Sequence, residues 1–328
     1  MTQSVQTLQA PIKAVRDNRQ GILILYAVLF VGGLLAPFVI YPVLMMKVLC
    51  FALFACAFNL LLGYTGLLSF GHAAFFGSAA YIAGYTIRDW SWPPLVGIGA
   101  GVLVAAALGW LFGILAIRRQ GIYFAMITMA LAQMVYFILL QSPFTGGEDG
   151  LQGVPRGSLL GIDLANDINL YYLIFGIVVL AFWLIYRVIH SPYGQVLKAI
   201  RENEARAVSL GYEVAKYKLL AFVLSAGLAG LAGALKMLVF TFASLTDAHS
   251  YQSGEVILMT ILGGIGTELG PVVGAATIVL LETGLADKVG SLVSVMMGCI
   301  FVICVLAFRR GIVGEATALY QRMTGQKY

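Results

Sequence analysis

Charged residues are scarce in this sequence. Only 11% of its 328 residues are Asp, Glu, Lys or Arg, whereas about 25% is usual in a soluble domain. Hydrophobic residues make up 60% of the chain, so a globule of this composition has too few polar groups to cover its surface. The sequence therefore excludes an ordinary soluble protein and predicts a chain that has membrane lipid as its solvent.

Cysteine and histidine are also rare, and neither forms a metal-binding pattern. The cysteines lie inside apolar runs, as Cys50, Cys56, Cys299 and Cys304, whereas zinc sites and disulfide frameworks need closer spacing and polar neighbours. The three histidines are scattered along the chain. We expect no metal site and no disulfide, and we interpret the cysteines as reduced packing residues.

The sequence lacks the motifs of nucleotide hydrolysis and of catalysis. It contains no G-x-x-x-x-G-K-[ST] phosphate loop, and the run Gly263-Gly264-Ile265-Gly266 has no lysine after it. No Ser/His/Asp set or pair of carboxylates stands out. We expect a chain that is not an enzyme and has no cofactor of its own, so that any ATP and Mg²⁺ must be bound by a partner protein.

Long apolar runs, in contrast, are abundant. A transmembrane helix needs about 20 predominantly apolar residues, and the clear candidates are 21–41, 43–63, 94–117, 121–141, 170–190, 217–239 and 291–308. Two further regions, 64–86 and 254–285, are interrupted by glycine and polar residues, which predicts broken or re-entrant helices. The sequence thus predicts an all-α polytopic membrane protein with about 8–10 transmembrane helices.

Basic residues lie mainly on one side of these spans. With the N-terminus inside, fifteen of the twenty Lys and Arg residues fall on the cytoplasmic side, which agrees with the positive-inside rule. The net charge of +5 therefore indicates membrane topology and not nucleic-acid binding. The expected layout is a cytoplasmic tail (1–20), a transmembrane domain (21–310) with a cytoplasmic loop (191–216) and a periplasmic loop (142–169), and a cytoplasmic tail (311–328).

The loop SPYGQVLKAIRENEARAVSLGYEVAKYK (191–218) is the only long cytoplasmic segment in this layout. Pro192 ends the preceding span, a helix is predicted from 195 to 210, and Gly211 ends that helix. Its apolar face holds Val196, Leu197, Ile200, Ala207 and Leu210, and its opposite face holds Lys198, Glu202 and Arg206. Such a helix either lies on the membrane surface or docks into a groove of another protein.

Glu204 falls at the border of this apolar face. A carboxylate there would sit at the rim of a docking groove, so we expect Glu204→Lys to weaken docking. Because the residue belongs to a loop that we expect to be solvated, its replacement should change the stability by only about 0.5 kcal/mol.

Several long motifs occur in the order found in one family of transporters. They are LLGYTGLLSFGHAAFFGSAAYIAGY (61–85), RRQGIYFAMITMALAQM (118–134), TGGEDGLQGVP (145–155), AIRENEARAVSLGYEVAKYKLLAFVLSAGLAGLAGAL (199–235) and ILGGIGTELGPVVGAA (261–276). From about residue 40 to residue 310 the chain resembles the permease subunits of ABC importers, and more narrowly the branched-chain amino acid permeases of the LivM kind.

The resemblance implies the ABC importer permease fold in a multi-pass protein of the bacterial inner membrane, with both termini cytoplasmic. It also implies a second homologous permease subunit, two cytoplasmic ATPase subunits that bind ATP and Mg²⁺, and a periplasmic solute-binding protein. The helix in the loop 191–216 would then meet the ATPases. The ATPase-coupling residues implied in this way are Lys198, Arg201, Glu202, Glu204, Ala205 and Gly211.

Polar residues and glycines in the spans and broken regions are candidates for the solute path, because polar groups at membrane depth usually face the protein interior. The polar candidates are Ser69, His72, Thr128, Gln133 and Glu255, and the glycine candidates are Gly63, Gly66, Gly263, Gly264 and Gly266. The glycines belong to two copies of the pattern Leu-Gly-x-x-Gly, at 62–66 and 262–266. The alternative for each Ser or Thr is a hydrogen bond to its own helix, and the alternative for His72 is a structural role.

The loop 142–169 is the longest predicted external segment. The glycines of its TGGEDG run permit a left-handed backbone, and its carboxylates are suited to basic residues of a binding protein. Gly146, Gly147, Glu148 and Asp149 are therefore candidates for periplasmic contact, with a plain polar turn as the alternative.

We expect this chain to be a subunit of an ATP-driven importer for branched-chain or similar neutral amino acids. A neutral zwitterion needs few fixed charges, which suits the sparse ionisable residues predicted within the spans. The nearest alternative is the same machine with urea or a short amide as its solute. The alternative from another class is an ion-coupled secondary transporter, which needs membrane carboxylates and no docking helix.

Overall fold

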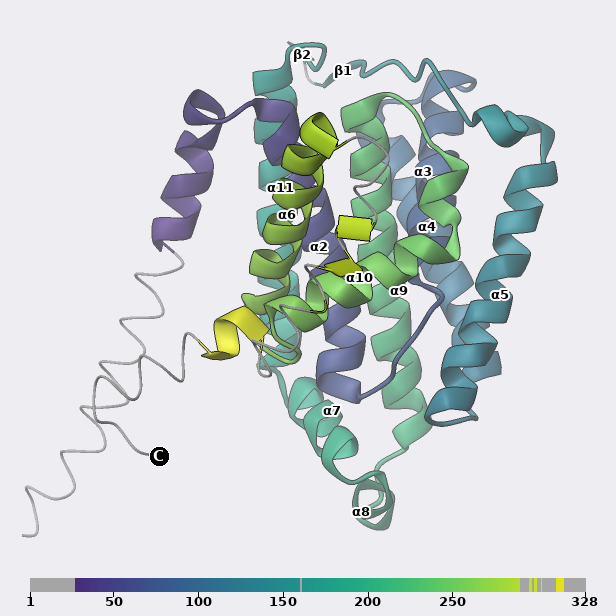
Figure 1. Ribbon diagram of the computed structural model, residues 1–328. Coiled ribbons are helices and arrows are strands. Elements are labelled where there is room, and N and C mark those ends of the chain that lie inside the picture. Colours follow the sequence, from purple (N-terminus) through teal and green to yellow (C-terminus); the bar gives the residue numbers. More distant parts are fainter. Residues whose placement is uncertain are drawn as a thin grey trace, which may run out of the picture.

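The computed structural model describes residues 27–159, 161–289 and 311–315, together with residues 295, 296, 298, 299 and 302. The predicted tail 1–20 and most of the predicted span 291–308 and tail 311–328 lie outside the described residues. The described chain is almost entirely helical (Figure 1), which confirms the predicted all-α class.

A helix at Ala27–Val39 precedes ten labelled α-helices. They are α2 (Pro42–Thr65), α3 (His72–Arg88), α4 (Pro94–Ala116), α5 (Ile122–Gln141), α6 (Asp167–Ile189), α7 (Pro192–Glu202), α8 (Glu204–Ser209), α9 (Val214–Phe240), α10 (Ser250–Gly263) and α11 (Gly270–Val289). Short 3₁₀ helices lie at Pro143–Thr145 (η1), Gly147–Asp149 (η2) and Leu245–Ala248 (η3), and an antiparallel pair of two-residue strands at Ser158–Leu159 (β1) and Ile162–Asp163 (β2).

Five of these helices, α2, α4, α5, α6 and α9, are long and apolar enough to cross a membrane. They confirm the spans predicted at 43–63, 94–117, 121–141, 170–190 and 217–239. The span predicted at 21–41 is described only as Ala27–Val39, and this helix lies against α6, where the Tyr171 hydroxyl donates to the Gly33 carbonyl at 2.5 Å.

The centre of the bundle is formed by α2 and α9. In their most apolar segments 72% and 78% of residues are buried, compared with 33–39% in α4, α5 and α6. Figure 1 shows α9 among α2, α3 and α4, with α5 at one edge. The two central helices therefore pack against protein, and α4, α5 and α6 present much of their surface to the surroundings.

Small residues allow these helices to approach closely. A Cβ atom added to Gly233 of α9 would overlap the Phe76 carbonyl of α3, and one added to Gly101 of α4 would lie 2.6 Å from the Ala79 carbonyl. Such contacts between backbones explain the glycine- and alanine-rich run of α9. Cys50 and Cys56 are buried as predicted for packing residues, whereas Cys299 is exposed, so that prediction is wrong for Cys299. Cys304 lies outside the described residues.

Both regions that the sequence marks as broken are broken in the structure. Gly66 (φ 75°) ends α2, and the chain then passes through a non-helical segment to α3, whose first residue lies inside the bundle. There His72 Nε2 is 2.8 Å from Ser225 Oγ, which donates to the carbonyl of Ala57 in α2. The second region forms α10 and α11, joined by the turn 264–269.

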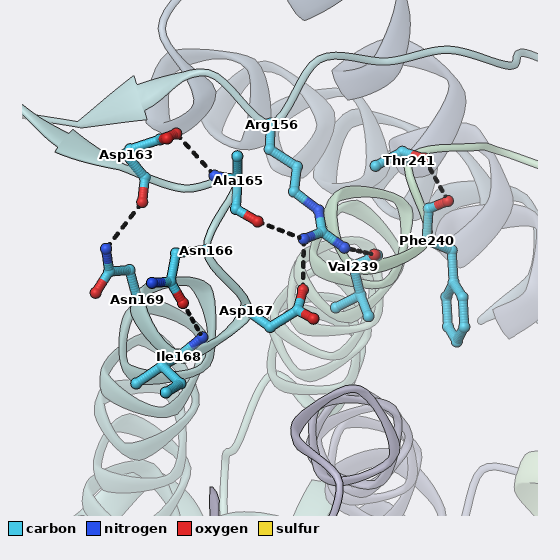
Figure 2. A network of polar contacts seen from close by, with 10 residues as sticks. All are labelled: Arg156, Asp163, Ala165, Asn166, Asp167, Ile168, Asn169, Val239, Phe240 and Thr241. Atoms are coloured by element: carbon cyan, nitrogen blue, oxygen red, sulfur yellow. Dashed lines mark hydrogen bonds and ion pairs between the residues drawn. The ribbon is translucent and has the colours of Figure 1, made fainter.

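Two ends of the bundle are distinct in Figure 1. At one end lie β1 and β2, and at the other lie α7 and α8; we call them the hairpin end and the α8 end. Figure 2 shows how Arg156 fixes the loop at the hairpin end. Its guanidinium donates to the Asp167 carboxylate (2.6 Å) and the Ala165 carbonyl (3.3 Å) at the start of α6, and to the Val239 carbonyl (2.8 Å) near the end of α9.

Two glycine-to-alanine changes on α9 test the close approach of α3. We expect Gly233→Ala to destabilise the protein by about 1–3 kcal/mol, because the new methyl group meets the rigid backbone of Phe76. The matched control is Gly227→Ala, whose Cβ has its nearest neighbour at 3.7 Å and which should be neutral or gain up to about 1 kcal/mol from helix propensity. Thermal unfolding in detergent compares the two, and equal effects would contradict the packing.

Candidate functional site

The segment at the α8 end consists of two helices and not of one. Asn203 has an extended backbone (φ −157°, ψ 98°) between α7 and α8, and its side chain accepts a hydrogen bond from Arg206 N at 3.0 Å. The single helix predicted from 195 to 210 is therefore wrong, because the asparagine caps a new helix instead of continuing the old one. Gly211 (φ 88°) follows the second helix, as predicted.

The break changes which side chains are buried. Leu197, Ile200 and Ala207 are buried as predicted, and Val196 packs against this cluster. Leu210 was expected on the same face but is 70% exposed, because α8 does not continue the helical phase of α7. Since Val208 and Tyr212 are also exposed, this end presents an apolar surface next to the exposed residues Glu202 and Ala205.

Arg201 connects α7 to both broken regions. Its guanidinium donates to the Gly63 carbonyl near the end of α2. A Cβ atom at Gly66 would lie 3.4 Å from the Arg201 side chain, and one at Gly266 would lie 3.0 Å from its guanidinium. One side chain of the surface segment thus contacts the last turn of α2 and the turn between α10 and α11.

Asn59 forms a second link between the same two regions. Its amide group donates to the Thr267 carbonyl at 2.9 Å and accepts from Gly266 N at 2.8 Å. The backbones of Gly63 and Gly266 also pack together, since a Cβ atom at Gly63 would lie 2.8 Å from Gly266 N. The two Leu-Gly-x-x-Gly patterns of the sequence therefore meet in space, and the glycine candidates Gly63, Gly66, Gly263, Gly264 and Gly266 lie near the α8 end.

Glu204 has a partner within its own chain. Its carboxylate lies 2.7 Å from Lys218 Nζ and accepts from Gln120 at 2.8 Å. The Lys218 side chain is only 5% exposed and that of Glu204 is 32% exposed. The residue lies at a border of the buried surface as predicted. It is not fully solvated as expected, because it pairs with a buried lysine, so we now expect its replacement to leave that lysine without its partner. The remaining coupling candidate, Lys198, lies over the Tyr64 ring at 5.7 Å.

Three of the polar path candidates are buried inside the subunit. Ser69 accepts from Gly71 N, Thr128 accepts from Phe70 N, and His72 is enclosed by phenylalanine rings at Phe58, Phe75 and Phe222. These contacts give the three side chains structural partners at the start of α3. Gln133 is half-buried on α5, and the role of all four in a solute path stays a prediction.

Charged side chains within the spans form a group of which the sequence indicated only Glu255. Lys236 Nζ lies 2.5 Å from Asp247, and Lys47 Nζ lies 2.9 Å from Glu282. Glu255 lies within electrostatic range of this group. The ionisable residues within the spans are few, as expected, but they are gathered into one group. A single charged residue in an apolar run is itself a signal in the sequence, since such a charge needs a partner. Which distant residue is that partner cannot be seen in one sequence.

The loop at the hairpin end has the predicted left-handed glycines. Gly146, Gly147 and Gly150 have φ values of 79°, 63° and 72°, and Leu151 then pairs with Ala243 as an isolated β-bridge. Glu148 and Asp149 are exposed. Glu148 also lines a cavity of about 260 Å³ with Tyr136, Leu140, Leu245, Thr246 and His249. The loop is thus fixed to the bundle, and its carboxylates are free to meet a partner.

The fold is that of a polytopic helical membrane protein. Comparisons with known proteins identify it as a permease. The family described as "Branched-chain amino acid transport system / permease component" matches residues 43–306, and the chain belongs to this family. The LivM permease proteins of Salmonella typhimurium and Escherichia coli K12, named as high-affinity branched-chain amino acid transport system permeases, are each 29% identical to it over 258 residues, or 70% of this chain.

The relatives also include a permease for a different solute. The ribose import permease protein RbsC of Escherichia coli K12 is 26% identical over 203 residues, which is 58% of this chain and 61% of that protein. The chain matches 60% of the length of the two LivM proteins. No solved structure matches the chain.

Mutation of Glu204 tests whether this residue forms an ion pair with the buried Lys218. We expect Glu204→Lys to cost about 3 kcal/mol, the lower end of the range for breaking a buried pair, because it places two positive charges beside each other with Lys218 almost fully enclosed. Glu202→Lys is the matched control on the exposed surface and should change stability by no more than about 0.5 kcal/mol. Thermal unfolding of the purified chain measures both, and a Glu204→Lys protein as stable as the control would contradict the pair.

Proposed function

We propose that this chain is a permease subunit of an ATP-driven importer that moves branched-chain or similar neutral amino acids across the bacterial inner membrane. The observation that carries the proposal is the contact of Arg201 with both helix breaks. Through this contact a movement of the exposed α7–α8 segment reaches the turns of α2 and of α10–α11. The family and the two LivM relatives support the proposal.

In this proposal the α8 end faces the cytoplasm and two ATPase subunits dock there. Glu202, Ala205 and the exposed apolar residues Val208 and Leu210 supply a mixed polar and apolar docking surface. The ATPases bind ATP and Mg²⁺, because no phosphate loop occurs in this sequence. A second homologous permease lies beside this one, and a solute-binding protein meets Glu148 and Asp149 at the hairpin end.

A sugar is the competing solute, since the chain also matches a ribose import permease. The test is uptake into proteoliposomes that contain this chain, a second permease, the two ATPases and the binding protein. We expect leucine uptake that requires ATP and every subunit, and no ATP hydrolysis by this chain alone. Uptake by this chain alone under a proton or sodium gradient would instead identify a secondary transporter, and uptake of ribose in place of leucine would identify the sugar permease.

The same assay tests whether Arg201 couples the α7–α8 segment to the two helix breaks. We expect Arg201→Ala to reduce uptake at least tenfold while the complex still assembles and hydrolyses ATP, because only the contact with Gly63 and Gly266 is removed. Arg187→Ala is the matched control, an exposed arginine on α6 outside the docking surface, and should leave uptake unchanged. Equal uptake by Arg201→Ala and the parent complex would reject this route of coupling.

The orientation is tested by labelling from one side of the membrane. Single cysteines at Glu202 and Glu148, both exposed, are placed in a background with Cys299→Ser and Cys304→Ser, because Cys299 is itself exposed. An impermeant maleimide added to inside-out vesicles should label the cysteine at 202 and not the one at 148, and intact cells should give the reverse. Labelling of both from one side would overturn the proposed topology.

A further inference from the structure

One carboxylate in the charged group within the spans, Glu255, forms no ion pair among the described residues, although Lys47 and Lys236 lie within electrostatic range of it. The two lysines of the group are each committed to one acid, Lys236 to Asp247 and Lys47 to Glu282. In the described part of this group, two lysines stand against three acids, so one acid is left without an ion pair. That acid is Glu255, whose hydrogen-bond partner among the described residues is the neutral amide of Gln252, at 2.8 Å.

The two faces of α10 differ in a way that places Glu255 at an open surface. One face is anchored: Ser253 accepts from Ala73 N at the start of α3, and Thr260 contacts the Ala55 carbonyl in the middle of α2. The other face carries Glu255, half-buried, and Tyr251, four residues earlier and 60% exposed. A Cβ atom at Gly254 would meet nothing within 4 Å, so there is room beside the carboxylate.

Because α10 lies between the two ends of the bundle (Figure 1), an ionised carboxylate on it is not compatible with a lipid-facing surface. Ionised groups within a membrane face a water-filled cavity or pair with another charge, and an isolated buried carboxylate is costly. The open side of α10 therefore lines either an aqueous path or the contact with another subunit. A solute that carries an ammonium group supplies the missing cation, whereas a sugar does not.

We propose that Glu255 binds the ammonium group of the transported solute. This inference rests on the proposed function and deepens it, because it assigns the recognition of an amine to one side chain of the permease itself. Lys47 and Lys236 act on Glu255 electrostatically but each form an ion pair with another acid, so Glu255 is the acid of the group left to meet a cationic amino group.

The first arm of the test is a protection experiment on the assembled complex. A cysteine at Gly254 in the Cys299→Ser, Cys304→Ser background reacts with a small thiol reagent, and we expect leucine to slow the reaction at least fivefold. The amine 3-methylbutylamine, which has the same side chain and no carboxylate, should also protect, and 4-methylpentanoate, which lacks the amine, should not. With Glu255→Gln the protection by both amines should disappear, and with Glu255→Asp it should partly return. Protection by 4-methylpentanoate equal to that by the amine would overturn the inference.

The second arm measures uptake with saturating leucine-loaded binding protein. We expect Glu255→Gln to lower uptake at least tenfold while ATP hydrolysis and co-purification of the second permease are unchanged. Glu213→Gln is the control, an exposed carboxylate on the other side of the bundle, and should transport like the parent. Loss of the second permease from Glu255→Gln would mean that Glu255 pairs with that subunit and would also overturn the inference. If the parent complex transports no leucine, the proposed function fails, and protection by 3-methylbutylamine still decides whether the site binds an amine.

Discussion

The structure depends on the hydrogen bonds that backbone N–H and C=O groups form where two membrane helices break. Backbone N–H and C=O groups that leave a helix inside a membrane have no water to replace their lost partners. Here Asn59 supplies both a donor and an acceptor to the turn between α10 and α11, and Arg201 supplies a donor to the carbonyl of Gly63. Asn59 belongs to α2 and bonds the turn after α10, while Arg201 bonds Gly63 and lies against Gly266. The two breaks are therefore held against each other.

Much of this fold follows from the sequence. Five spans and both broken regions are marked by the length of apolar runs and by their interruptions, because a bilayer imposes a length that a single sequence displays directly. The contacts that make these elements into a site are not marked in this way. The meeting of the two Leu-Gly-x-x-Gly patterns, the Arg201–Gly63 hydrogen bond and the Lys47–Glu282 pair each join residues more than 100 positions apart, so their partners are defined only by the fold.

The prediction at the α8 end was wrong for a local reason. Periodicity favours one helix from 195 to 210, but Asn203 offers its own side chain as an N-cap, and this competes with helix continuation. The break has a consequence for function. It leaves Arg201 at the last turn of α7, where it reaches the helix breaks, and turns Leu210 outward to the surface. A continuous helix would instead have kept Leu210 on the predicted apolar face with Ile200 and Ala207.

Arg201 and Glu255 are both connected to α10. Arg201 contacts the turn at the end of this helix, and Glu255, the proposed ligand of the solute, lies on the helix itself. The turn that Arg201 contacts follows directly after α10, and Glu255 lies eight residues before the end of that helix, or roughly 12 Å along its axis. This half-length helix is held by Ser253 and Thr260 on one face and packs closely against α11, where a Cβ atom at Gly274 would overlap the Met259 carbonyl. In the proposed complex, a displacement of α7 by a docked ATPase would reach the turn at the end of α10 through Arg201, and through that helix the surroundings of Glu255. The carboxylate would then need no contact of its own with the ATPases, because the half-length helix connects the two.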